Sequence, residues 1–142
     1  MATKYDTANS TQQIEAPEND SLLIRIRSGV SAGGAGNPSE IVIRTDSISG
    51  GEILTGYISG NASGQTGAPS PLYSGGDGGN GSSTAYDDSD PGYGGGGSSG
   101  VEAPDGTMLG RADGPGGGGG GTSPYTPNGS SYGGGGGGGG GG

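Results

Sequence analysis

Glycine is concentrated in the second half of this chain, and this uneven distribution limits the folds that the chain can adopt. Residues 61–142 hold 33 of its 41 glycines, and the other 8 lie in residues 1–60. Leu, Ile and Val follow the opposite trend, with 13 of 16 in residues 1–60. Burying one such side chain contributes about 2 kcal/mol, and ordering one backbone residue costs about 1–2 kcal/mol. We therefore expect a hydrophobic core only in the first part of the chain.

The change in composition predicts a division of the chain into four parts. They are a polar arm over 1–20, a small β-sheet module over 21–60, a linker over 61–74 and a glycine-rich part over 75–142. Because the polar arm has few apolar residues, we expect it to become ordered only against a partner.

Residues 21–60 carry the alternation of apolar and polar side chains that is typical of half-buried strands. Leu22, Ile24 and Ile26 alternate with polar neighbours within residues 21–28, and this spacing predicts a strand. Similar patterns predict strands over residues 40–45 and 52–58. A sheet of three short strands is marginal alone. We expect it to pair with a second copy, with another protein or with the glycine-rich part.

Four glycine-dense runs divide the second half of the chain. They begin at Gly75, Gly92, Gly114 and Gly133, and the loops between them span residues 82–91, 101–113 and 122–132. Such tracts form flexible coils, or they pack as extended polyglycine helices because the absence of Cβ atoms lets their backbones approach closely. The predicted fold is a small N-terminal β-sheet plus a glycine-rich bundle of polyglycine-II-type extended helices, with little or no α-helix.

The glycine runs resemble the glycine-rich domains of bacteriophage tail-fibre tip adhesins. The matching stretches lie within residues 74–142 and are Ser74 to Ser83, Gly94 to Ser98, Gly114 to Gly121, and Tyr132 with the ten glycines that follow it. The resemblance implies a sandwich of polyglycine helices whose intervening loops recognise the host surface. It also implies a virion protein that is synthesised in the host cytoplasm, which agrees with the lack of a signal peptide in the sequence that begins at Met1.

If successive glycine runs alternate in direction, loops 82–91 and 122–132 lie together at the far end of the bundle. The predicted receptor-binding residues at these loop tips are Tyr86, Asp87, Asp88, Asp90, Tyr125 and Asn128. Tyrosine side chains stack on sugars and form hydrogen bonds; alternatively, these residues are solvated turns. The three aspartates have the hard oxygen ligands that calcium prefers, but they also fit a solvated acidic loop, and no metal or cofactor is assigned.

Loop 101–113 would lie at the opposite end, next to the predicted sheet. We expect its apolar residues Val101, Met108 and Leu109 to pack at this base, near Ile41, Ile43 or Ile53 or against a partner. The alternative is a chance placement of three apolar residues in one loop.

Composition excludes several classes of function. The chain has no Cys and no His, so zinc sites and Cys or His nucleophiles are absent, and we predict no enzyme. A net charge of −9 with only five basic residues disfavours nucleic acids and anionic membranes. Apolar runs of at most three residues predict no membrane insertion.

Two classes of function remain open at this point. The first is a virion structural protein at a tail or fibre tip that recognises a host surface polysaccharide or outer-membrane protein. It would attach to a fibre shaft or tail protein through residues 1–60, and assembly as a homo-oligomer is left open. The alternative is a purely structural glycine-rich protein that decorates a virion or packs in a virion or extracellular filament.

Overall fold

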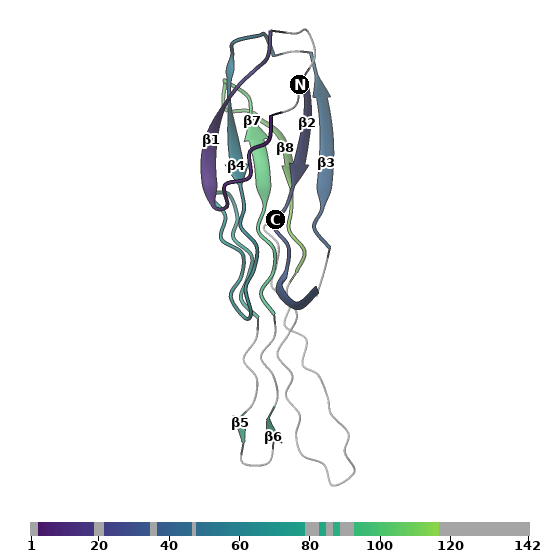
Figure 1. Cartoon of the computed structure of the whole chain (residues 1–142), viewed down its shortest axis with the longest axis vertical. Helices are drawn as coiled ribbons and strands as arrows, with labels where there is room; N and C mark the ends of the chain where they lie inside the picture. The colour runs from purple at the N-terminus through teal and green to yellow at the C-terminus, as the bar shows by residue number, and fades with distance from the viewer. Residues whose placement is uncertain are drawn as a thin grey trace.

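Two antiparallel β-sheets face one another in the computed structural model (Figure 1). The structure describes residues 3–18, 22–34, 37–46, 48–78, 83–84, 87–88 and 93–116. The four-stranded sheet has the order β1 (Ser10–Glu15), β4 (Ile53–Ile58), β7 (Ser99–Glu102) and β8 (Met108–Ala112). The second sheet is a ribbon of β2 (Leu22–Arg27) and β3 (Glu40–Thr45). A separate short hairpin joins β5 (Ser83–Thr84) to β6 (Asp87–Asp88), and a 3-10 turn covers Ala32–Gly34.

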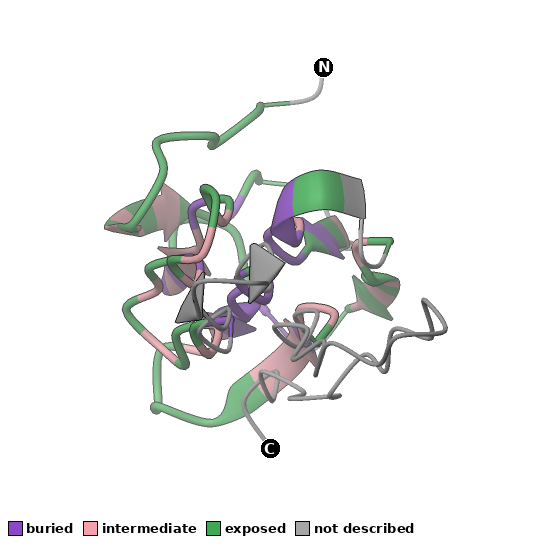
Figure 2. Ribbon diagram, turned by 90° about the horizontal axis from the view of Figure 1, so that it is seen from below, coloured by how far each residue is buried: buried purple, intermediate pink, exposed green. Residues whose placement is uncertain are grey.

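The core lies between the two sheets because both present their apolar residues to the inside. In the β2–β3 ribbon, Ile24 pairs with Ile43 and Ile26 pairs with Ile41, and all four pack in or against the core. Leu54 of β4 is fully buried. The buried cluster consists of Ala16, Ile26, Ile48, Leu54, Val101 and Ala112. When the molecule is viewed from below, down its long axis, the buried residues gather near the centre (Figure 2).

A glycine of β8 lets the two sheets approach closely. A Cβ atom on Gly110 would lie 2.1 Å from Cδ1 of Ile43 and 2.8 Å from Cδ1 of Ile41. Contacts between side-chain tips and bare backbone therefore fill part of the core, so a small number of aliphatic residues is enough to close it.

The prediction of a polyglycine-helix bundle as the fold is wrong. The described residues form a small β-sandwich, and β7 and β8 of the glycine-rich part belong to its four-stranded sheet. Strand ladders and the core between the two sheets, rather than packed glycine helices, order residues 99–102 and 108–112. The run over residues 133–142 lies outside the described residues.

Extended segments continue from the strands below the sandwich and lie side by side (Figure 1). We call them the glycine shaft; it consists of residues 29–32, 60–68, 75–78, 94–97 and 114–115. Backbone hydrogen bonds join neighbouring segments: the amide of Gly95 donates to the carbonyl of Gly76 at 2.9 Å, and the amide of Ala68 donates to the carbonyl of Gly95 at 2.8 Å. Only glycine fits at position 75, since a Cβ atom there would lie 1.9 Å from the carbonyl oxygen of Gly95.

The strands cross the boundaries that composition suggests. The predicted strands over 21–28, 40–45 and 52–58 are present as β2, β3 and β4, but β4 lies in a different sheet from β2 and β3. Strand β1 lies inside the predicted polar arm and pairs with β4 along its whole length. Strand β7 pairs with the other edge of β4, so residues from both halves of the chain form one sheet. Among the described residues, no helix has the length and apolar character needed to cross a membrane.

Candidate binding surfaces

The first candidate surface is the hairpin at the far end of the molecule from the sandwich (Figure 1). Ser83 pairs with Asp88 and Thr84 pairs with Asp87, so the two strands of this hairpin are antiparallel. Asp87 and Asp88 are therefore placed in β6, at the distal end. We call β5 and β6 the distal hairpin. The other predicted receptor-binding residues, Tyr86, Asp90, Tyr125 and Asn128, lie outside the described residues.

The predicted base residues lie at different depths in the sandwich. Val101 is buried in the core, and Leu109 packs against it together with Ile41 and Ile43. Met108 is 37% exposed. Its sulfur approaches Gly100 on the outer side of the four-stranded sheet, where a Cβ atom on that glycine would lie 3.1 Å away.

A second candidate surface lies on the outer face of the four-stranded sheet. Gly100 pairs with Tyr57 on one side and with Arg111 on the other, so these three residues form one row across the sheet. In the neighbouring row, Glu102 pairs with Thr55 and with Met108. We call Tyr57, Tyr73, Glu102, Met108 and Arg111 the outer patch.

Tyr57 and Glu102 are joined by a hydrogen bond within this patch. The phenol of Tyr57 donates to Oε2 of Glu102 at 3.0 Å. This bond raises the pKa of Tyr57 above its ordinary value, and partial desolvation and the negative charge of Glu102 act in the same direction. The phenol therefore stays neutral at physiological pH.

Arg111 is held at the lower edge of the patch by a carboxylate and an aromatic ring. Its Nε lies 2.8 Å from Oδ1 of Asp113, and its Nη2 donates to Oδ2 at 3.2 Å. The Arg111 Cζ lies 4.9 Å from the ring centroid of Tyr73, a cation–π distance. The Tyr73 side chain is nevertheless half exposed, since 44% of this residue is accessible. A surface of this kind can stack on a ligand and form hydrogen bonds with it.

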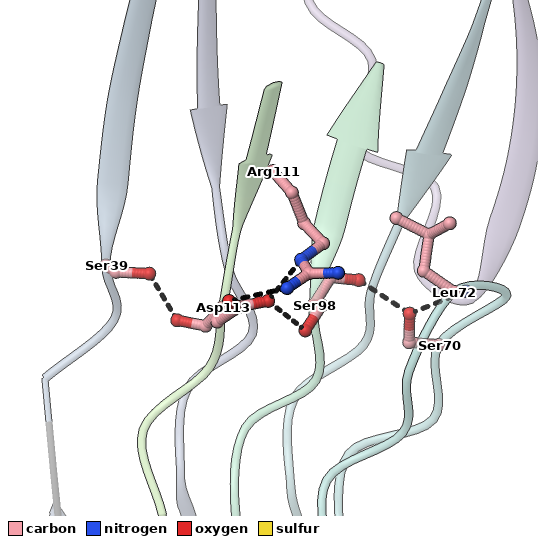
Figure 3. A network of polar contacts seen from close by, with 6 residues as sticks. All are labelled: Ser39, Ser70, Leu72, Ser98, Arg111 and Asp113. Carbon is pink, nitrogen blue, oxygen red and sulfur yellow. Dashed lines mark hydrogen bonds and ion pairs between the residues drawn. The ribbon is translucent and has the colours of Figure 1, made fainter. Parts of the chain in front are cut away.

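A polar network fixes Asp113 at the point where the sandwich meets the glycine shaft (Figure 3). The hydroxyl of Ser98, which is fully buried, donates to Oδ1 of Asp113 at 2.8 Å. The hydroxyl of Ser39, next to β3, donates to the carbonyl of Asp113. On the other side, the Ser70 hydroxyl donates to the Ser98 carbonyl at 2.6 Å. The network thus connects both sheets and the loop between shaft segments 60–68 and 75–78.

Sequence reasoning missed three residues of the outer patch. Tyr57 lies 45 positions before Glu102 in the chain, and no local pattern connects these residues with Arg111. One simple feature does single out Arg111, which is the sole basic residue after position 60. Within the described part of the chain, no group of three or more His, Cys, Asp or Glu residues could hold a metal ion.

Comparison with family models, with curated proteins and with solved structures finds no match to this chain. The surfaces described above and the glycine runs are the features of this chain that bear on its function.

Proposed function

We propose that this chain is a recognition module at a phage tail or fibre tip, and that its distal hairpin contacts the host cell surface. The observation that carries the proposal is the position of β5 and β6, which lie at the end of an elongated molecule, away from the sandwich (Figure 1). The resemblance of the glycine runs to tail-fibre tip adhesins supports the same role.

The glycine shaft suits a module that must hold a loop away from its base. Its segments are joined by repeated backbone hydrogen bonds, such as Gly75 to Ala68 at 2.8 Å and Gly94 to Gly64 at 2.9 Å. A loop on a hydrogen-bonded support loses less conformational entropy when it binds than a loop on a flexible linker does. A target that suits the distal hairpin is a polar one, such as a host polysaccharide or an outer-membrane protein loop.

The same hydrogen bonds favour recognition over a purely structural packing role. A protein whose glycine runs pack against other chains needs free backbone groups for those contacts. The shaft amides of Gly94, Gly95 and Gly96 instead donate within this chain, to Gly64, Gly76 and Pro115 respectively. These amides are therefore not available to bond another filament subunit.

The experiment compares binding of the labelled full-length chain to intact host cells. We expect the Asp87→Asn/Asp88→Asn variant and the Tyr86→Ala/Tyr125→Ala variant each to bind at least about tenfold more weakly than the wild type. The control is Glu15→Gln/Glu18→Gln, which also removes two negative charges, but from exposed positions on the sandwich. This control should bind normally. Unchanged binding by both hairpin and loop variants would assign recognition to another surface.

A second measurement tests the assignment to a virion. An antibody raised against the sandwich should label the tip of a tail or fibre in purified virions. Virions that incorporate the Tyr86→Ala/Tyr125→Ala variant normally but fail to adsorb would separate recognition from assembly. Absence of the protein from virions would overturn the proposal.

A further inference from the structure

The outer face of the β2–β3 ribbon combines arginine and apolar side chains in a regular pattern. Three cross-strand pairs point outward: Leu23 with Arg44, Arg25 with Val42, and Arg27 with Glu40. Leu23 is 59% exposed and Val42 is 53% exposed. Pairs on one face of such a ribbon lie about 5 Å apart across the strands. Along each strand, the next outward residue follows about 7 Å further on. We call these six residues the ribbon face.

The ribbon face differs strongly in charge from the rest of the molecule. It holds three of the five basic residues of the chain, while the other two, Lys4 and Arg111, share the remainder with 13 of the 14 acidic residues. The one acid on the face, Glu40, lies 3.5 Å from Nε of Arg25 and 3.6 Å from Nε of Arg27. Among the described residues, no carboxylate forms an ion pair with Arg44.

The apolar positions lie between the charges rather than apart from them. Leu23 and Val42 are diagonal neighbours, and each is paired across the ribbon with an arginine. Protein–protein interfaces are enriched in arginine and exclude water at their centre, so an exposed leucine and valine between arginines suit a protein partner. A polyanion without apolar groups would leave Leu23 and Val42 uncovered.

Charge also decides against a symmetric pair of copies. A two-fold interface places the same patch on both sides, so the arginines of one ribbon face would lie against those of the other. Like charges in contact cost binding free energy, and a single Glu40 on each side is already shared by Arg25 and Arg27.

We propose that the ribbon face docks an extended acidic segment of a second protein. Carboxylates of that segment would pair with Arg25, Arg27 and Arg44, and an apolar side chain between them would cover Leu23 and Val42. The face lies on the sandwich, away from the distal hairpin (Figure 1). It is thus suited to attachment, and the inference does not depend on the recognition role of the hairpin.

The test measures binding of a fluorescent synthetic peptide of alternating Glu and Val to the full-length chain by anisotropy. We expect saturable binding that weakens as salt shortens the Debye length from about 10 Å at 0.1 M to about 3 Å at 1 M. Arg25→Gln/Arg44→Gln should bind about tenfold more weakly, and Leu23→Ser/Val42→Ser should also lose affinity. The matched control Lys4→Gln, and the hairpin variant Asp87→Asn/Asp88→Asn, should bind like the wild type.

Four outcomes would overturn the proposal. The first is failure of the wild-type chain to bind the Glu–Val peptide. The second is equal binding of a Lys–Val peptide, which would show that charge does not select the partner. The third is equally strong binding of heparin that Leu23→Ser/Val42→Ser does not weaken, which would point to an anionic polymer. The fourth is a wild-type dimer that the same variant dissociates, which would make a second copy the occupant. Circular dichroism should show that each variant keeps its fold.

Discussion

At the scale of single residues, the contact between Tyr57 and Glu102 is the most informative one. The two side chains are brought together by the pairing of β4 with β7, and the neutral phenol donates to the carboxylate at 3.0 Å. Ionisation of the phenol would remove this donor and place a second negative charge beside Glu102. For this reason the pKa of Tyr57 is raised in the folded state.

We expect Glu102→Gln to lower the pKa of Tyr57 toward its ordinary value of about 10, because the amide carries no negative charge. In the wild type, the stabilisation from this contact is present below the pKa of the unfolded state. It is lost as pH rises through the higher folded pKa. The wild-type free energy of unfolding should therefore fall more steeply above pH ~10 than that of Glu102→Gln.

Nuclear magnetic resonance of ¹³C-labelled tyrosine measures this pKa directly, and urea unfolding on either side of that pH measures the stability. Glu15→Gln, which changes an exposed carboxylate on β1, should leave the Tyr57 titration as it is. An unchanged Tyr57 pKa in Glu102→Gln would contradict the assigned hydrogen bond.

At the scale of elements, the glycine shaft depends on backbone contacts that no larger residue permits. A Cβ atom on Gly67 would lie 1.9 Å from the carbonyl oxygen of Gly75, and a Cβ atom on Gly94 would lie 2.1 Å from that of Thr66. These obstacles are backbone atoms, which cannot rotate away as a side chain can. The shaft segments would have to separate to admit a methyl group.

We therefore expect Gly75→Ala to destabilise the protein by about 1–3 kcal/mol, the usual cost of overpacking. The matched substitution is Gly51→Asn, at a turn where φ is +82° and no atom lies within 4 Å of the added Cβ. Asparagine tolerates this conformation, so the change should stay within about 0.5 kcal/mol. Urea unfolding measures both variants. Equal stability of Gly75→Ala and the wild type would mean that the shaft segments are not closely packed in solution.

At the scale of the whole molecule, charge is distributed unevenly. The net charge is −9, and the concentration of arginines on the ribbon face leaves the remaining surface more acidic than the total suggests. Folding brings the acidic residues closer together than they are in the unfolded chain. Self-repulsion of this kind lowers the stability of the compact state.

We expect the unfolding temperature to rise by a few degrees when salt increases from ~0.01 M to ~0.15 M, because screening reduces this repulsion. The exposed pairs of Arg25 and Arg27 with Glu40 are worth too little to reverse the effect. Differential scanning calorimetry in NaCl and in KCl should give the same rise. A fall in the unfolding temperature with salt would show that attractive ion pairs outweigh the net repulsion.

Strands with strong hydrophobic alternation could be predicted from the sequence alone. Leu22, Ile24 and Ile26 predict β2, and similar patterns predict β3 and β4, because the side chains of a half-buried strand alternate between a buried and an exposed face. Neither the pairing of these strands nor the outer patch could be predicted, since Tyr57 and Glu102 are brought together by a ladder between distant segments.

Which weakly patterned segments become strands depends on contacts that form only in the folded molecule. Ile14 is the sole aliphatic residue of β1, and β7 has Val101 alone, so local sequence favoured an arm and a loop. Both form strands because they add backbone hydrogen bonds to the two edges of β4 and cover the same core. Such pairing depends on a neighbour distant in sequence, and its stabilisation exists only when that neighbour is in place.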